Sequence, residues 1–227
     1  MRKNGSRLIS FSQYRTADLF LFVIIAGLAE LFSYAATIWF PEEAIFSFSF
    51  ALPIILIVMM RWGWPSVFYA AGSAVLYCAL RSLSWQYYLS YAVGSAAIII
   101  CLAYLLPVGK ERVAKSWYLS VVFVILAWAA VVLARSVMLT VTGVYGFVAA
   151  LSMMAGYADC GLLSLVMGII TILIVRKFDG LFEDQKAYLI RLGKLSEEKR
   201  RVDTFGERLE EIDEENLSIL NHNDELY

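Results

Sequence analysis

The chain has very few of the residues on which most catalytic and metal sites depend. His222 is the only histidine, and the three cysteines, Cys78, Cys101 and Cys160, are far apart and lie in apolar segments. The sequence has no CxxC pair and no Cys/His cluster, which argues against a metal site and a disulfide framework and favours buried structural thiols. It also lacks the Gly-x-Ser-x-Gly, His-Glu-x-x-His and Walker-type motifs. We therefore expect a chain that is not an enzyme and has no cofactor.

Charge is also scarce. Only 17% of the residues are charged whereas 60% are hydrophobic, and the mean hydropathy is +0.68, which is typical of a membrane protein and not of a soluble domain. Residues 1–175 contain ten Lys/Arg and six Asp/Glu, but residues 176–227 contain nine and fourteen. The sequence thus predicts a basic cytoplasmic N-terminus (1–15), a transmembrane domain (16–177) and an acidic cytoplasmic helical tail (178–227). No feature predicts a nucleic-acid partner.

The transmembrane domain is predicted to be an all-α bundle of six membrane-spanning helices. A hydrocarbon core about 30 Å thick needs roughly 17–25 helical residues. The segments that meet this length and composition are Ala17–Phe40, Ala44–Met60, Trp64–Leu80, Tyr87–Leu106, Trp117–Ala134 and Tyr157–Val175. The first is expected to be an uncleaved helix and not a signal peptide, because Glu30 interrupts it.

Tryptophans and basic residues predict where these helices end and how they are oriented. Tryptophan occurs at several of the predicted ends, as expected of an interfacial aromatic belt. With the N-terminus inside, ten Lys/Arg fall on the inner side and only Arg81 and Arg135 on the outer side. The excess of positive charge predicts that both termini are cytoplasmic in the plasma membrane. The segment Ser136–Gly156 is ambiguous: it can be an outer re-entrant or capping loop, or an extension of the neighbouring helices.

Two acidic residues lie within apolar stretches and indicate a polar pocket. Glu30 falls in the first predicted span and Asp159 near the outer start of the sixth. A carboxylate within the hydrocarbon region is costly unless it faces the bundle interior or a water-filled cavity. Aromatic and charged residues on the same predicted side complete a candidate solute site. The expected ligand-binding residues are Glu30, Arg81, Trp85, Tyr88, Tyr91, Arg135, Tyr145 and Asp159.

Two other interpretations of these charges stay open. Glu30 or Asp159 can pair with Arg135 as an internal ion pair that fixes the helix register. A proton relay is the other, although no ladder of carboxylates continues toward the cytoplasmic side.

The tail predicts a helix with a short heptad repeat. Leu195, Val202 and Leu209 recur every seven residues, and the polar Asn216 takes the next such position. The second apolar position of each heptad is taken by Phe205, Ile212 and Ile219. This spacing is typical of a coiled coil or a docking helix. A helix lying on an anionic membrane is excluded for this segment because its acidic residues would be repelled.

Two segments resemble a known family. The run from Pro53 to Trp64 resembles the junction between the second and third spans of some S-component-like proteins, and Arg176 to Arg191 resembles the stretch after their sixth span. The chain is therefore similar, over about Thr16–Arg191, to the substrate-binding S components of energy-coupling factor (ECF) vitamin transporters.

The resemblance implies a solute receptor in the membrane that captures a vitamin-like micronutrient from outside. It implies as partners the solute, membrane lipid, a transmembrane coupling protein and ATPase subunits. The first span has Ala26 and Ala29 but no strict Ala-x-x-x-Ala surface, and the acidic tail is additional to the family core. The alternative is a noncatalytic membrane scaffold whose coiled-coil tail recruits a partner.

Overall fold

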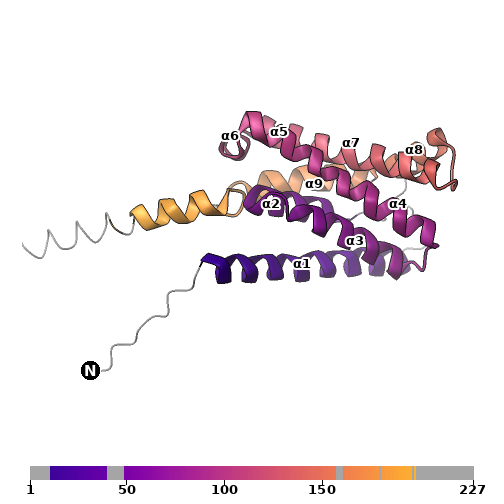
Figure 1. Cartoon of the computed structure of the whole chain (residues 1–227), viewed down its shortest axis with the longest axis horizontal. Coiled ribbons are helices and arrows are strands. Elements are labelled where there is room, and N and C mark those ends of the chain that lie inside the picture. Colours follow the sequence, from indigo (N-terminus) through magenta and orange to yellow (C-terminus); the bar gives the residue numbers. More distant parts are fainter. Residues whose placement is uncertain (1–10, 40–48, 157–160, 179, 196, 198–227) are drawn as a thin grey trace, which may run out of the picture. The chain divides into compact units, whose positions relative to one another are not determined.

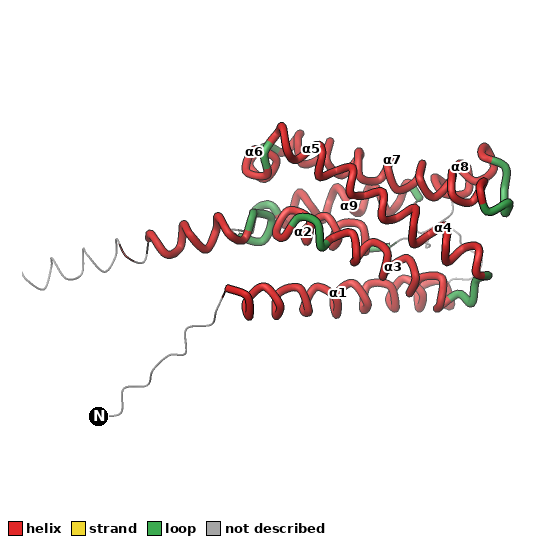
Figure 2. Tube along the Cα trace, viewed as in Figure 1, coloured by secondary structure: helices red, strands yellow, loops and turns green. Residues whose placement is uncertain are grey.

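The chain is helical throughout the part that the structure describes. The computed structural model describes residues 11–39, 49–156, 161–178, 180–195 and 197, and these form helices, turns and short loops with no strand (Figure 1, Figure 2). The chain forms two units, Met1–Asp184 and Gln185–Tyr227. The helices of the first unit are α1 (Phe11–Trp39), α2 (Ala51–Trp62), α3 (Ser66–Leu80), α4 (Trp85–Ala96), the 3₁₀ turn η2 (Ala97–Ile99), α5 (Ile100–Val108), α6 (Lys110–Lys115), α7 (Trp117–Val141), α8 (Phe147–Gly156) and α9 (Leu162–Val175).

Three helices are long and apolar enough to cross a membrane. They are α1, the continuous segment Trp85–Val108 and α7, with 29, 24 and 25 residues. At 1.5 Å per residue each is roughly 36 Å or longer, which exceeds a hydrocarbon core of about 30 Å. Four tryptophans at helix ends are largely exposed, as interfacial anchors are: Trp39, Trp64, Trp85 and Trp117. The described part of the chain is therefore all-α, as predicted, with three helices that could cross a membrane.

The remaining apolar helices are shorter than the predicted spans. Helix α2 begins at Ala51, seven residues later than predicted, and α9 begins at Leu162, five residues later. Just before α2, the Ser49 hydroxyl accepts a hydrogen bond from the amide of Ala51, the first residue of the helix. The ambiguous segment divides in two: α7 extends to Val141, and α8 is a separate short helix.

Helix α2 forms the centre of the first unit. Ten of its twelve residues are buried, including every residue from Pro53 to Arg61. A helix that is apolar all round is stable only when other helices surround it. Its neighbours in the hydrophobic core include side chains of α1, α3 and α7, such as Phe22, Ala70 and Phe123. This packing fixes the frame in which the polar residues are placed.

Arg61 joins three segments of the first unit at the C-terminal end of α2. Its guanidinium forms an ion pair with Asp18 of α1, with 2.7 Å between Nη2 and Oδ1, and donates to the carbonyl of Gly180 at 2.6 Å. The Trp62 indole also donates to Asp18. Arg61 is only 6% exposed, so its charge needs partners within the protein. The carboxylate of Asp18 and the carbonyl acceptors provide them.

Helices α4 and α7 approach each other closely at one glycine. A Cβ atom added to Gly94 would lie 2.7 Å from Cα and 2.8 Å from the backbone nitrogen of Arg135. Backbone atoms cannot move aside as a flexible side chain can, so the crossing requires a residue without a side chain. Gly94 thus allows α7 to pack directly against α4 at Arg135.

The second unit is described only at its beginning. Residues 185–195 are helical, and Leu195, the first member of the predicted heptad repeat, is exposed. The other heptad residues lie outside the described residues, so the coiled coil stays a prediction.

We expect Gly94→Ala to separate α4 from α7 and to lower the free energy of unfolding by about 1–3 kcal/mol, the usual cost of overpacking. Gly72→Ala is the matched control, because a Cβ atom there meets no atom within 4 Å. Alanine is the better helix former, so the control should be neutral or slightly stabilising. Denaturation of the purified protein in detergent measures both variants, and equal stability of the two would contradict the close crossing.

Candidate functional site

Polar side chains meet in the half of the first unit toward the end where α3 and α7 finish and α8 lies, here called the α8 end (Figure 1). Glu30 reaches this region from α1. It lies on the same helical stripe as the buried residues Phe22, Ala26 and Ser33, and only 1% of it is exposed. The carboxylate therefore faces protein and not lipid, as the cost of charge in hydrocarbon requires.

Ser49 connects Glu30 to α9. Its hydroxyl donates to Glu30 Oε1 at 2.8 Å, and its backbone amide donates to the hydroxyl of Ser164 at 3.0 Å. Both serines are buried. Three polar groups from segments far apart in sequence thus form one wall of the region.

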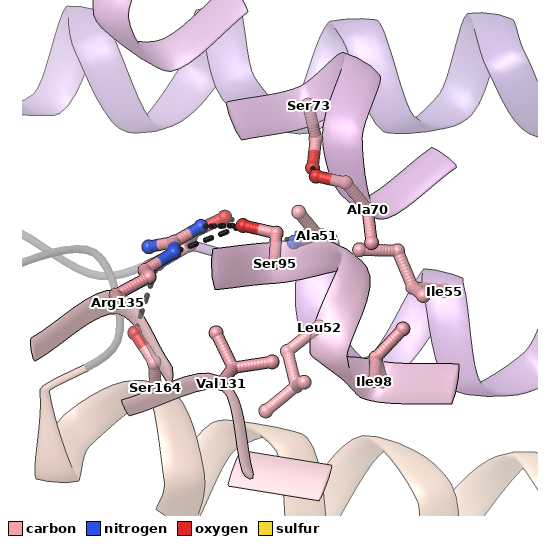
Figure 3. A pocket seen from close by; sticks show the side chains of 11 residues that line it. Ala51, Leu52, Ile55, Ala70, Ser73, Ser95, Ile98, Val131, Arg135 and Ser164 are labelled. Carbon is pink, nitrogen blue, oxygen red and sulfur yellow. Dashed lines mark hydrogen bonds between the residues drawn. The ribbon is translucent and has the colours of Figure 1, made fainter. Parts of the chain in front are cut away.

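Arg135 reaches this region from α7. Its Nε and Nη2 atoms donate to the hydroxyl of Ser95 at 2.9 and 2.7 Å (Figure 3). Ser95 in turn donates to the carbonyl of Tyr91. Arg135 is 4% exposed and Ser95 is 2% exposed. Hydrogen bonds from a charged donor stabilise such a buried guanidinium.

A small cavity is lined by the serines and the arginine just described. Its volume is about 30 Å³, and its polar lining consists of Ser49, Ser73, Ser95, Arg135 and Ser164. Apolar side chains from α2, α3, α7 and η2 form the rest of its surface (Figure 3). A polar cavity of this size accommodates water molecules and is far smaller than a vitamin.

A larger groove lies beside the cavity, between α1 and α3. Its volume is about 270 Å³, and it is lined by apolar and small residues that include Ala26, Gly27 and Gly72. Ser73 borders both the cavity and the groove. Only one side chain on α3 is therefore common to the polar interior and the apolar groove.

Two arginines and two tyrosines form a column at the α8 end. The rings of Tyr77 and Tyr91 stack with centroids 5.4 Å apart and an angle of 12° between their planes. The Arg81 guanidinium lies 3.9 Å from the Tyr77 ring and the Arg135 guanidinium 4.5 Å from the Tyr91 ring. Both distances suit cation–π interactions.

The structure brings some of the sequence-predicted site residues together. Arg81, Tyr91 and Arg135 belong to the column, and Tyr145 reaches it indirectly through Tyr87. The Tyr87 hydroxyl donates to the hydroxyl of Tyr145 at 3.0 Å.

Two other predicted residues do not line the cavity. Trp85 is 70% exposed at the start of α4, and Tyr88 is half-buried against the apolar cluster that contains Tyr77 and Tyr91. Asp159 lies outside the described residues. An ion pair of Glu30 or Asp159 with Arg135 stays a prediction.

Sequence reasoning did not identify four important residues. Ser49, Ser95 and Ser164 provide the hydrogen bonds around the cavity, and Tyr77 stacks against Tyr91. Serine is common in membrane helices as a packing residue, so its presence alone gives no signal for a site.

Metal ligands do not gather in the part of the chain that is described: no three His, Cys, Asp or Glu side chains come together there. Cys78 and Cys101 are buried thiols, and Cys160 lies outside the described residues. No protein-family model, curated protein or solved structure matches this chain. The functional argument therefore rests on the geometry of the site.

We expect Ser95→Ala to lower the free energy of unfolding by about 1.5–3 kcal/mol, because Arg135 loses the acceptor of two of its hydrogen bonds. Ser73→Ala is the matched control, since the Ser73 hydroxyl lines the same cavity but donates only to Ala70 of its own helix. That control should cost less than about 1 kcal/mol. Unfolding in detergent measures both, and an equal loss would show that Ser95 does not hold Arg135.

Proposed function

We propose that this chain is the membrane-embedded solute-binding subunit of an ATP-driven uptake transporter for a vitamin-like micronutrient. The solute binds in the half of the bundle toward the α8 end, which faces the outside of the plasma membrane. Six spans with both termini in the cytoplasm are part of this proposal, because that orientation puts ten Lys/Arg on the inner side and only Arg81 and Arg135 outside.

The observation that carries the proposal is the convergence of buried polar groups on one cavity in an otherwise apolar bundle. Its lining includes Arg135, Ser95, Ser49 and Ser164, which come from four separate segments. Ionisable residues such as Arg135 are rare in membrane helices and mark solute pathways, and ligand sites are mostly apolar with a few convergent polar groups. The cavity supports a binding site better than a simple anchor, whose interior needs no polar groups.

Binding of a vitamin-sized molecule requires this region to open. The cavity of about 30 Å³ is too small, but the adjacent groove of about 270 Å³ approaches the lower end of the range for ligand pockets, roughly 300–1,000 Å³. Because Ser73 borders both, movement of α1 away from α3 would join them. Most residues of α1 are not buried, so α1 is held less tightly in the bundle than α3.

ATP hydrolysis is assigned to other subunits. The chain has no Walker-type glycine-rich motif, so the proposed transporter includes separate ATPases and a transmembrane coupling protein.

We expect native mass spectrometry of the purified wild-type protein to detect a co-purified small molecule, which Glu30→Ala and Arg135→Ala lose. Each variant removes a buried charge that positions the polar walls of the cavity. Arg112→Ala is the matched control, because Arg112 is exposed at the other end of the unit and should leave the molecule bound. Membrane yield and helical content, measured for every variant, show that the chains have inserted.

Retention of the molecule by both variants would remove the assignment of the site. Protein subunits held tightly with no small molecule would instead support the scaffold.

A further inference from the structure

Arg81 is a partly buried arginine that differs from the two buried arginines of the first unit. It follows the last residue of α3, and its two terminal nitrogens, Nη1 and Nη2, are shielded from solvent without a hydrogen-bond acceptor in the part of the chain that the structure describes. Arg61 and Arg135 are buried, but the fold provides acceptors for each of them. A buried polar group without an acceptor indicates a group that is supplied from elsewhere, such as an ion.

The backbone around Arg81 fixes where its side chain begins. The amide of Leu83 donates to the carbonyl of Cys78, and the amide of Ser82 donates to that of Ala79, which is the hydrogen-bond pattern of a Schellman helix end. Ser82 takes the left-handed position of this motif with φ 50°, where glycine is the usual residue. Arg81 is thus the last residue before the chain reverses.

Two tyrosine rings lie against the guanidinium of Arg81. Arg81 lies over the Tyr77 ring at 3.9 Å, and a second ring, that of Tyr34 on α1, lies 6.0 Å away. A guanidinium that stacks through its face keeps its N–H groups at the edge, in the geometry that binds both oxygens of a carboxylate or phosphate. The tyrosines hold the cation but cannot accept these in-plane hydrogen bonds through their faces.

Of the described charges at this end, Arg81 and Arg135 are positive and Glu30 is negative. The rings of Tyr77 and Tyr91 stack on each other, and the Arg81 guanidinium contacts the first ring and the Arg135 guanidinium the second. The attraction between Arg81 and an anion bound to it would be screened little by water.

From these observations we infer that Arg81 binds an oxyanion, a carboxylate or phosphate group, through its Nη1 and Nη2 atoms. If the oxyanion belongs to the transported solute, the inference rests on the proposed function and assigns that solute to the anionic class. The phosphate of a membrane lipid has the same chemistry and is the other possible source.

The test measures the thermal stability of the full chain in detergent with inorganic phosphate as the probe, at constant ionic strength maintained with chloride. Phosphate should stabilise the wild type and Arg112→Gln, and Arg81→Met should bind it at least about tenfold more weakly. Arg81→Lys keeps the charge but loses the paired donors, so its affinity should be intermediate.

The stability of Arg81→Met without phosphate is a second readout. Since this variant removes a cation whose terminal nitrogens are shielded from solvent without an acceptor, it should unfold at a temperature no lower than the wild type. A clear loss of stability would mean that Arg81 is a structural residue and would overturn the inference. Equal phosphate binding by Arg81→Met and Arg112→Gln would overturn it as well.

The source of the oxyanion is tested with vesicles of phosphatidylcholine alone or mixed with phosphatidylglycerol, followed by native mass spectrometry. A retained anionic solute that Arg81→Met loses supports both proposals. Retention of phosphatidylglycerol alone, dependent on Arg81, supports the oxyanion site and contradicts the proposed function. A neutral solute that Arg81→Met still holds supports the proposed function and contradicts the oxyanion site.

Discussion

The structure depends on one constraint: a charged side chain inside an apolar bundle needs hydrogen-bond partners from the protein. Arg61 meets this need with Asp18 and the Gly180 carbonyl at one end of the first unit. Near the other end, Arg135 donates to Ser95, and Glu30 accepts from Ser49. Each partner comes from a different segment, so the polar contacts determine which helices lie together as well as where the site is.

Apolar packing provides the frame for these contacts. Helix α2 is surrounded on all sides, which holds Ser49 beside its first turn and Arg61 in its last. The absence of a side chain at Gly94 brings α4 against α7, so Ser95 lies within hydrogen-bond distance of Arg135. The polar region is thus a consequence of close helix packing, and its small volume follows from the same cause.

The sequence predicted the helical class and the regions of most helices, because long apolar runs and tryptophans mark them directly. It also predicted that Glu30 faces the interior, and the structure places this residue on the buried face of α1. It did not predict the late start of α2, where Ser49 accepts from the amide of Ala51, or the stacking of Tyr77 on Tyr91. Both depend on contacts that a local pattern of hydrophobicity does not contain.

The most direct measurement of the proposed solute-binding role is the side of the membrane that each end of the bundle faces. Tyr145 is partly exposed at the α8 end, and Lys115 is exposed at the opposite end of the first unit, where α6 lies. In a variant without native cysteines, we predict that Tyr145→Cys reacts with a membrane-impermeant thiol reagent in intact cells and Lys115→Cys only after permeabilisation. Labelling of Lys115→Cys in intact cells, with Tyr145→Cys protected, would put the polar site at the cytoplasmic side and contradict capture from outside.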